Sequence, residues 1–216
     1  MSKYVVYDLE MCRVPKGEGR DIFGSGMELI QIGAVLLDED YRTLDSFVTY
    51  VRPRFGRVDR FIERLTGIKQ SDVENAPSTE QALAAFLEWI PEEAVLVSWS
   101  NSDAIQIYNE LDGKGIVCID VERLEDLLYD SIDCQEEFDC RLDSPKSYSL
   151  SNALSISGVD CEITVHDALT DAKNTALLFA KLETEPELKL SSYYLTEADM
   201  RTYAVPFRPS VRAGRR

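Results

Sequence analysis

Tyr4-Val-Val-Tyr-Asp-Leu-Glu10 places two carboxylates at the end of an apolar run of β-branched and aromatic residues. Such a run is typical of a buried strand, which we expect over residues 4–9. Because side chains alternate along a strand, Asp8 and Glu10 should share one face, ~6.6 Å apart along the chain. Carboxylates at the end of a buried strand are costly unless a cation compensates them, and a divalent metal ion is the simplest such cation.

The segments that follow predict the rest of a sheet. ELIQIGAVLLD (28–38) and TLDSFVTYV (43–51) flank a polar turn, so the first three strands should form an antiparallel meander. Strands expected over residues 94–99 and 115–119 alternate with helices, which indicates parallel pairing. The fold class is therefore α/β, with a mixed five-stranded sheet (three-strand antiparallel meander plus two parallel strands) flanked by helices. We expect a loop over residues 13–26 and helices over residues 58–65, 79–90, 102–111, 121–132, 149–156, 167–183 and 196–202.

Capping signals mark several of the expected helix ends. Gly67 suits the C-terminal cap of the helix over residues 58–65. Ser71 with Glu74, and Ser78 with Gln81, fit the capping box that begins many helices.

The length of 216 residues matches one domain of ordinary size. We expect a single domain over residues 1–200 and a basic, flexible C-terminal tail over residues 201–216, which hold five arginines and no acid. The tail is either a solvated extension or an arm that contacts phosphates. Five cysteines without a Cys-x-x-Cys pair indicate reduced thiols rather than a disulfide framework or a structural zinc site.

The net charge of −16 disfavours proteins that coat duplex DNA or an anionic membrane through a broad basic face. The acidic segment over residues 120–143 is interpreted as a solvated helix face and loop. The sequence has no run of 18 apolar residues, and its first residues lack the layout of a signal peptide. We therefore expect a cytoplasmic protein without membrane contact.

Three further polar residues are candidates for chemistry. Asp103 follows the expected strand over residues 94–99, in the first turn of the next helix, where acids also occur simply to complement the helix dipole. His166, the single histidine of the chain, precedes a helix that Asp167 should cap, and Asp171 lies near its first turn. Taken alone, His166 fits a structural histidine and Asp171 a solvated acid. One histidine excludes metal sites that need two imidazoles, such as HExxH.

Asp8-x-Glu10, Asp103, and His166 followed five residues later by Asp171 together resemble the three motifs of the DEDDh subgroup of DnaQ-like 3′-to-5′ exonucleases. Glu28-Leu-Ile-Gln-Ile-Gly-Ala-Val and Phe61-Ile-Glu-Arg-Leu-Thr-Gly-Ile68, followed by Asn75-Ala-Pro77, extend the resemblance to the KapD-type and histone-mRNA-exonuclease-like branch. The resemblance covers roughly residues 3–183, and it implies a ribonuclease-H-like fold.

The resemblance also implies roles for the five motif residues. Asp8, Glu10, Asp103 and Asp171 would hold two Mg²⁺ or Mn²⁺ ions, with Asp8 bridging them and Asp103 acting mostly through water. Hard oxygen ligands favour these ions over zinc. His166 would be the general base that takes a proton from the attacking water.

A second implication concerns the nucleotide at the 3′ end. The segment after the first motif and the Thr-Gly-Ile loop place Met11, Leu65 and Thr66 beside the terminal nucleotide. Ordinary packing of Met11 and a purely structural Gly67 are the alternative. Because Met11 and Cys12 stand where relatives vary, the nucleotide preference stays open.

The function implied is a metal-dependent 3′-to-5′ exonuclease that removes nucleoside monophosphates from single-stranded RNA or DNA, with RNA favoured over DNA. A proofreading-type DNA exonuclease and an oligoribonuclease-like enzyme are the enzymatic alternatives. A non-catalytic interaction module on the same fold is the alternative from another class, although all five motif residues are present. The sequence identifies no protein partner and no oligomeric state.

Overall fold

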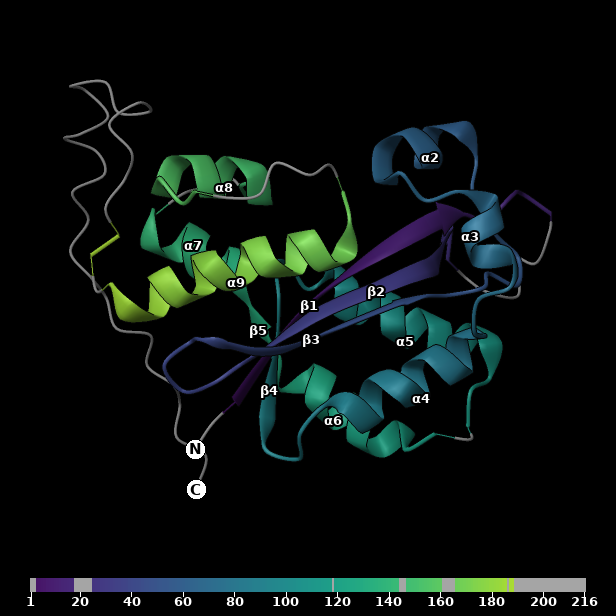
Figure 1. Cartoon of the computed structure of the whole chain (residues 1–216), viewed down its shortest axis with the longest axis horizontal. Coiled ribbons are helices and arrows are strands. Elements are labelled where there is room, and N and C mark those ends of the chain that lie inside the picture. The colour runs from purple at the N-terminus through teal and green to yellow at the C-terminus, as the bar shows by residue number, and fades with distance from the viewer. Residues whose placement is uncertain are drawn as a thin grey trace.

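The computed structural model describes residues 3–17, 25–117, 119–143, 147–160, 166–185 and 187–188. Within these residues, one five-stranded sheet has the order β3-β2-β1-β4-β5. β1 (Lys3–Arg13), β2 (Met27–Leu37) and β3 (Thr43–Tyr50) form the antiparallel part. β4 (Ala94–Ser98) pairs in parallel with β1, and β5 (Ile132–Asp133) pairs in parallel with β4. The expected mixed sheet with its meander is confirmed (Figure 1).

The fifth strand does not lie where the sequence predicts it. Gly115 adopts a left-handed φ of 63° and ends the preceding helix, and Ile116 packs into the core without joining the sheet. Residue 118 of the predicted strand lies outside the described residues. Instead, Ile132 and Asp133 pair with Val97 and Ser98. Two residues are too few to show the alternation by which a strand is recognised in sequence.

The described helices otherwise follow the prediction closely. The helix expected over residues 121–132 is α6 (Val121–Tyr129), which ends earlier, and α7 (Cys134–Arg141) lies within the segment interpreted as a solvated helix face and loop. The prediction over residues 196–202 and the tail over 201–216 lie outside the described residues, so the domain boundaries stay predictions. The remaining helices are α2 (Arg60–Thr66), α3 (Gln70–Glu74), α4 (Thr79–Trp89), α5 (Ser102–Lys114), α8 (Leu150–Ser157) and α9 (Ala168–Thr184).

Of the capping signals at Gly67, Ser71 and Ser78, two are confirmed and one is wrong. Gly67 ends α2 with a φ of 75°, and Ser78 begins α4 with the expected capping box. The box predicted from Ser71 and Glu74 does not form. α3 begins two residues earlier than that box requires, so Asp72 is its third residue and accepts the backbone N–H of Lys69 at 2.8 Å.

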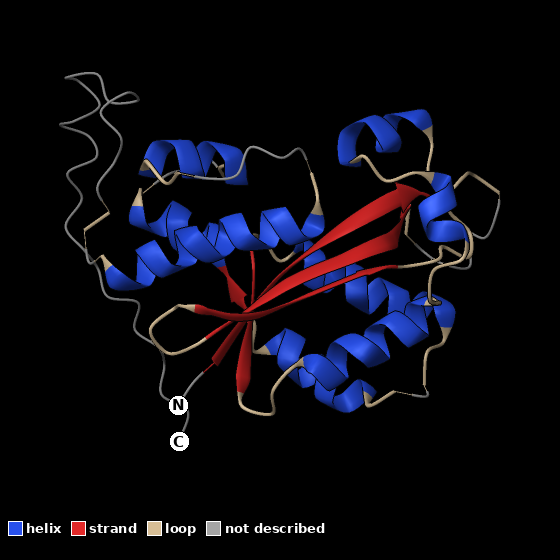
Figure 2. Cartoon of the chain, viewed as in Figure 1, coloured by secondary structure: helices blue, strands red, loops and turns tan. Residues whose placement is uncertain are grey.

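Helices cover both faces of the sheet (Figure 2). Val5, Tyr7 and Leu9 of β1 pack with α4, α5 and α6, whereas Val6 packs with α7, α8 and α9. Among the described helices, none has both the length and the apolar character needed to cross a membrane. Because alternate residues share a face, Asp8 and Glu10 continue the row of Val6 and point to the α9 side of the sheet.

A buried ionic cluster joins α5 to β2. The ammonium of Lys114 lies 2.6 Å from Glu28 Oε1 and 2.7 Å from Glu110 Oε2, and both carboxylates are fully buried. Glu28 also accepts the backbone N–H groups of Arg54 and Phe55 at 2.6 and 2.8 Å. The cluster therefore holds the chain between β3 and α2 against the sheet.

Replacing the lysine of this cluster should destabilise the protein strongly. Lys114→Met leaves two buried carboxylates without their cation, and we expect the free energy of unfolding to fall by about 3–5 kcal/mol in urea titrations. Arg42→Gln is the control, because its ion pair with Asp40 at 2.8 Å is exposed and should contribute less than about 1 kcal/mol. Equal effects of the two substitutions would contradict a structural role for the cluster.

Candidate active site

Asp8 and Glu10, the residues of the first motif, lie on β1 beyond the point where β4 stops pairing with it. β4 pairs with β1 only as far as Val6, and no other described strand lies beside the rest of β1 on that side. Asp8 pairs with Gly33 of β2 and Glu10 pairs with Gln31, and the register shifts directly after Glu10. Asp8 is partly buried and Glu10 is buried, so two carboxylates lie on the part of β1 that does not pair with β4.

Asp103, from α5, lies beside the same part of β1. It lies in the first turn of the helix, as predicted, and its side chain is only 5% exposed. The backbone N–H of Leu9 opposes the rise that burial causes in the pKa of this carboxylate, and no described strand pairs with β1 at that residue on the side away from β2. Asp103 lies beside Asp8 and contributes, after burial, the largest rise in the pKa of Asp8.

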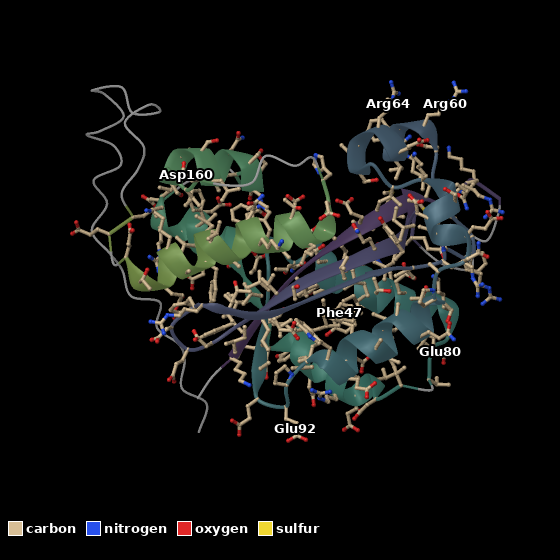
Figure 3. All side chains as sticks on the ribbon, viewed as in Figure 1. Phe47, Arg60, Arg64, Glu80, Glu92 and Asp160 are labelled. Atoms are coloured by element: carbon tan, nitrogen blue, oxygen red, sulfur yellow. The ribbon has the colours of Figure 1, made fainter. Side chains whose placement is uncertain are left out.

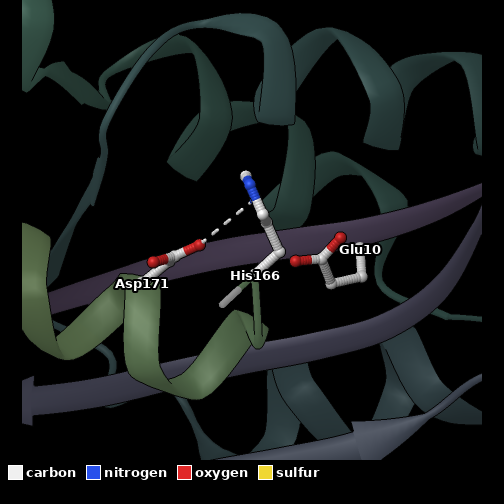
Figure 4. A group of neighbouring side chains, drawn as sticks. All are labelled: Glu10, His166 and Asp171. Atoms are coloured by element: carbon white, nitrogen blue, oxygen red, sulfur yellow. Dashed lines mark ion pairs between the residues drawn. The ribbon is translucent and has the colours of Figure 1, made fainter. Parts of the chain in front are cut away.

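The start of α9 brings the third motif over β1. Asp167 caps the helix as predicted, accepting the backbone N–H of Thr170 at 3.0 Å. His166 precedes the cap with a left-handed φ of 38°, and its Nδ1 lies 4.0 Å from Asp171 Oδ2. Glu10, His166 and Asp171 each offer a ligand atom within 4.8 Å of the others (Figure 4). Residues distant in sequence thus converge on one point.

Gln31 and Gly33 of β2 lie in the segment over residues 28–35 that extends the family resemblance, where neither was assigned a role, and they hold α9 in this position. Gln31, which is 2% exposed, accepts the backbone N–H of Ala168 at 3.1 Å and donates to Asp167 Oδ2 at 3.2 Å. A Cβ on Gly33 would lie 2.1 Å from the backbone nitrogen of Leu169, so only glycine allows this approach. The sequence signal was a glutamine with apolar residues on either side of it in the strand.

Burial and mutual repulsion perturb the acids of the site. Burial raises the pKa of Glu10 to about 8, with the charges of Asp171, Asp167 and Asp103 adding to the rise. Burial also raises the pKa of Asp103 to about 7 and that of Asp8 well above its usual range. Asp171 has a raised pKa because burial outweighs the opposing charge of His166.

These residues fit a divalent cation. Among the described residues, no lysine or arginine forms an ion pair with Asp8, Glu10, Asp103 or Asp171, so their charges lack a side-chain counter-ion other than His166. Carboxylate oxygens are the ligands that Mg²⁺ and Mn²⁺ prefer. Asp8 and Asp103 lie beside the compact group of Glu10, His166 and Asp171 rather than within it. A cation here would compensate charge that the fold otherwise leaves repulsive.

The residues predicted to touch the terminal nucleotide differ in how exposed their side chains are. Met11 follows the register shift in β1 and is partly exposed, as is Leu65 in α2. Thr66 is buried, and its hydroxyl donates to the Ile62 carbonyl at 2.9 Å and accepts the Ile68 N–H at 3.1 Å. A substrate-binding role for these three residues stays a prediction.

The variant Gln31→Leu tests whether Gln31 holds the start of α9 against β2. The leucine has a similar volume but leaves the buried N–H of Ala168 without its partner, so we expect a loss of about 1–3 kcal/mol in the free energy of unfolding. The stabilisation of the protein by Mg²⁺, measured as a rise in Tm, should also decrease, because Asp171 loses its position over Glu10. A full Mg²⁺ response in this variant would show that Gln31 does not position the site.

The raised pKa values predict a pH dependence of stability without metal. Glu10 and Asp103, with folded-state pKa values of about 8 and 7, keep protons that the unfolded chain loses near pH 4. The unfolded state therefore binds fewer protons in this window, and the free energy of unfolding in EDTA should fall as pH rises from about 5 to 8. The variant Glu10→Gln/Asp103→Asn should show a shallower fall in urea titrations. Equal slopes for both proteins would refute the predicted burial of charge.

Comparison with known proteins places the chain in a family. Residues 5–179 match the exonuclease (RNase_T) family. The chain is 28% identical over 184 residues to ERI1 exoribonuclease 2 of Danio rerio, across 77% of this chain and 33% of that protein. It is 28% identical over 181 residues to the PolC-type DNA polymerase III of Caldanaerobacter subterraneus, across 84% of this chain and 12% of that protein. The chain thus spans a third or less of the length of these relatives.

Solved structures share the fold. The nuclease domain of 3′hExo, a DEDDh family member bound to rAMP, has a TM-score of 0.68 at 21% identity, covering 88% of this chain and 96% of that chain. E. coli exonuclease I bound to a dT13 oligonucleotide has a TM-score of 0.56 at 16% identity, covering 85% of this chain and 41% of that chain. The ribonuclease-H-like fold and the resemblance to histone-mRNA-exonuclease-like proteins are confirmed. With most of its length matched, this chain belongs to the exonuclease (RNase_T) family of hydrolases.

Proposed function

We propose that this protein is a metal-dependent 3′-to-5′ exonuclease that removes nucleoside monophosphates from single-stranded ends, with RNA favoured over DNA. The observation that carries the proposal is the convergence of Glu10, His166 and Asp171 within 4.8 Å, with Asp8 and Asp103 beside them. Membership of the exonuclease family supports the reaction class. The neighbours in fold that are named 3′-exonucleases support the direction of digestion.

The four carboxylates would hold the metal ions. Asp8, Glu10, Asp103 and Asp171 supply oxygen ligands from β1, α5 and α9, and two Mg²⁺ or Mn²⁺ ions suit this number of acids. When bound, such ions supply a nucleophile at neutral pH and stabilise negative charge on the departing 3′ oxygen. The protein contributes the geometry, because three separate elements fix the acids before substrate arrives.

His166 would be the general base. Its side chain is 54% exposed, so the imidazole is accessible to substrate and water, and its Nδ1 lies 4.0 Å from Asp171 Oδ2. A base in this position takes the proton of the attacking water as the phosphodiester bond breaks. No second histidine exists in the chain to replace it.

The two curated relatives support different substrates. The match to ERI1 exoribonuclease 2 supports RNA, and the equal identity to a PolC-type DNA polymerase supports the alternative of a proofreading-type DNA exonuclease. An oligoribonuclease-like preference for short RNA is the remaining enzymatic alternative. Uncompensated acids at the convergence point oppose a purely structural interaction module. The cytoplasmic location stays a prediction from sequence.

A degradation assay with 5′-labelled single-stranded RNA and DNA tests the proposal. We expect a ladder of 3′-shortened products with Mg²⁺ or Mn²⁺, none with EDTA, and faster digestion of RNA than of DNA. His166→Ala should lower kcat by about 10²–10⁴, because general-base catalysis typically contributes that factor. Asp8→Asn should remove the metal-dependent activity.

Asp160→Asn is the matched control for the acid substitution. Asp160 is also followed two residues later by a glutamate, but it is exposed and lies away from the converging residues (Figure 3). Its amide variant should digest RNA at the rate of the unmodified protein. Undiminished activity of Asp8→Asn, or digestion that EDTA does not stop, would refute the metal-dependent mechanism.

A further inference from the structure

The chain around α2 carries a charge opposite to that of the molecule as a whole. Residues 52–69 contain six basic and two acidic residues, a net of +4, which leaves −20 on the rest of the chain. All six basic side chains are exposed: Arg52, Arg54, Arg57, Arg60, Arg64 and Lys69. A local excess of positive charge attracts anions even when the rest of the molecule is strongly acidic.

Part of this segment forms a continuous surface with the end of β1. We define the α2 basic surface as Arg13, Arg57, Arg60, Phe61 and Arg64. The backbone N–H of Arg57 donates to the carbonyl of Arg13 at 3.2 Å, and the Arg13 guanidinium lies 4.6 Å from the centre of the Phe61 ring. These contacts fix the surface to the strand that carries the first motif.

Two arginines of the surface are available to a ligand. Arg60 and Arg64 lie one helical turn apart, and both side chains extend outward from α2 (Figure 3). Arg64 donates from Nε to the Arg60 carbonyl at 3.1 Å, which orients it without neutralising its charge. Within the described part of the chain, neither guanidinium forms an ion pair with a carboxylate. The backbone N–H of Ile62 lowers the pKa of Asp59, and Arg64 adds to this lowering only electrostatically, so both guanidinium groups keep free donors for a ligand.

The α2 basic surface lies close to the proposed site of hydrolysis. Arg13 is three residues beyond Glu10, ~10 Å along an extended strand. β1 runs beneath the start of α9 toward α2, so the convergence point and the surface lie along the same strand (Figure 1). A single-stranded nucleic acid whose 3′ end reaches Glu10 can therefore continue over α2.

We propose that the α2 basic surface binds the phosphates of the single strand upstream of its 3′-terminal nucleotide. The inference rests on the proposed function and extends it to the path of the substrate. Guanidinium groups bind phosphate oxygens through paired hydrogen bonds, and the half-exposed ring of Phe61 offers a partner for base stacking. A narrow basic surface within an acidic molecule suits one strand and not a duplex, because the surrounding charge repels further phosphates.

The charge-neutral variant Arg60→Gln/Arg64→Gln tests this path. With an oligonucleotide of about 20 nucleotides at low salt, KM should rise about fivefold to tenfold. The ratio of kcat/KM for this substrate to kcat/KM for a dinucleotide should fall by the same factor, because a dinucleotide does not reach α2. The dependence of log KM on log salt concentration should flatten by about 1.4, since each phosphate contact on a single strand contributes about 0.7.

Lys3→Gln/Arg42→Gln is the matched control. It removes the same charge from exposed residues at the opposite end of β1, where β1 begins and the turn after β2 lies. This variant should keep the substrate ratio and the salt dependence of the unmodified protein. Equal changes in the two variants would show an effect of net charge only and overturn the proposal, as would an unchanged KM in Arg60→Gln/Arg64→Gln.

A binding measurement separates this proposal from the proposed function. Fluorescence anisotropy in EDTA reports the affinity for the labelled oligonucleotide without hydrolysis, and Arg60→Gln/Arg64→Gln should weaken it at least about fivefold. If the protein has no nuclease activity but binds the oligonucleotide, and the variant weakens that binding, the proposed exonuclease function is wrong and the binding role of the α2 basic surface stands. If the variant instead loses affinity for a poly-glutamate peptide and keeps that for the oligonucleotide, the surface serves an acidic protein partner and the proposal is wrong.

Discussion

The close contact between β2 and the first turn of α9 is the constraint on which the site depends. Gly33 lets the helix backbone approach the strand, and Gln31 fixes the approach by bonding both Ala168 and Asp167. Since β2 is paired with β1 in a defined register, this contact also determines what lies beneath the helix. His166 and Asp171 are placed over Glu10 because the sheet and the helix meet in one arrangement only.

That arrangement concentrates negative charge that the fold itself does not compensate. Burial and mutual repulsion raise the pKa values of Asp8, Glu10 and Asp103, so the metal-free site is held against an electrostatic cost. Elsewhere the protein compensates buried carboxylates with one of its own side chains, because the ammonium of Lys114 forms ion pairs with the buried Glu28 and Glu110. The contrast between a compensated and an uncompensated cluster distinguishes structural acids from acids that suit a bound cation.

The distribution of charge explains how so acidic a chain could act on a polyanion. A net charge of −16 opposes broad contact with nucleic acid, but it does not oppose contact through bound cations and a few arginines. The convergence point and the α2 basic surface both lie along the second half of β1. Recognition in the proposed function is therefore short and directional, from the terminal phosphodiester toward α2.

Local sequence determined the features that depend on neighbouring residues. The apolar run before Asp8, the cap of α9 at Asp167 and the glycine that ends α2 were predictable because hydrogen bonds and alternation act over a few residues. The motif residues were found as a set through a family resemblance. Tertiary structure alone decided that a two-residue β5 completes the sheet, and that Gln31 bonds Asp167, 136 residues away in the chain. Such pairings arise from packing between distant segments, which no local pattern records.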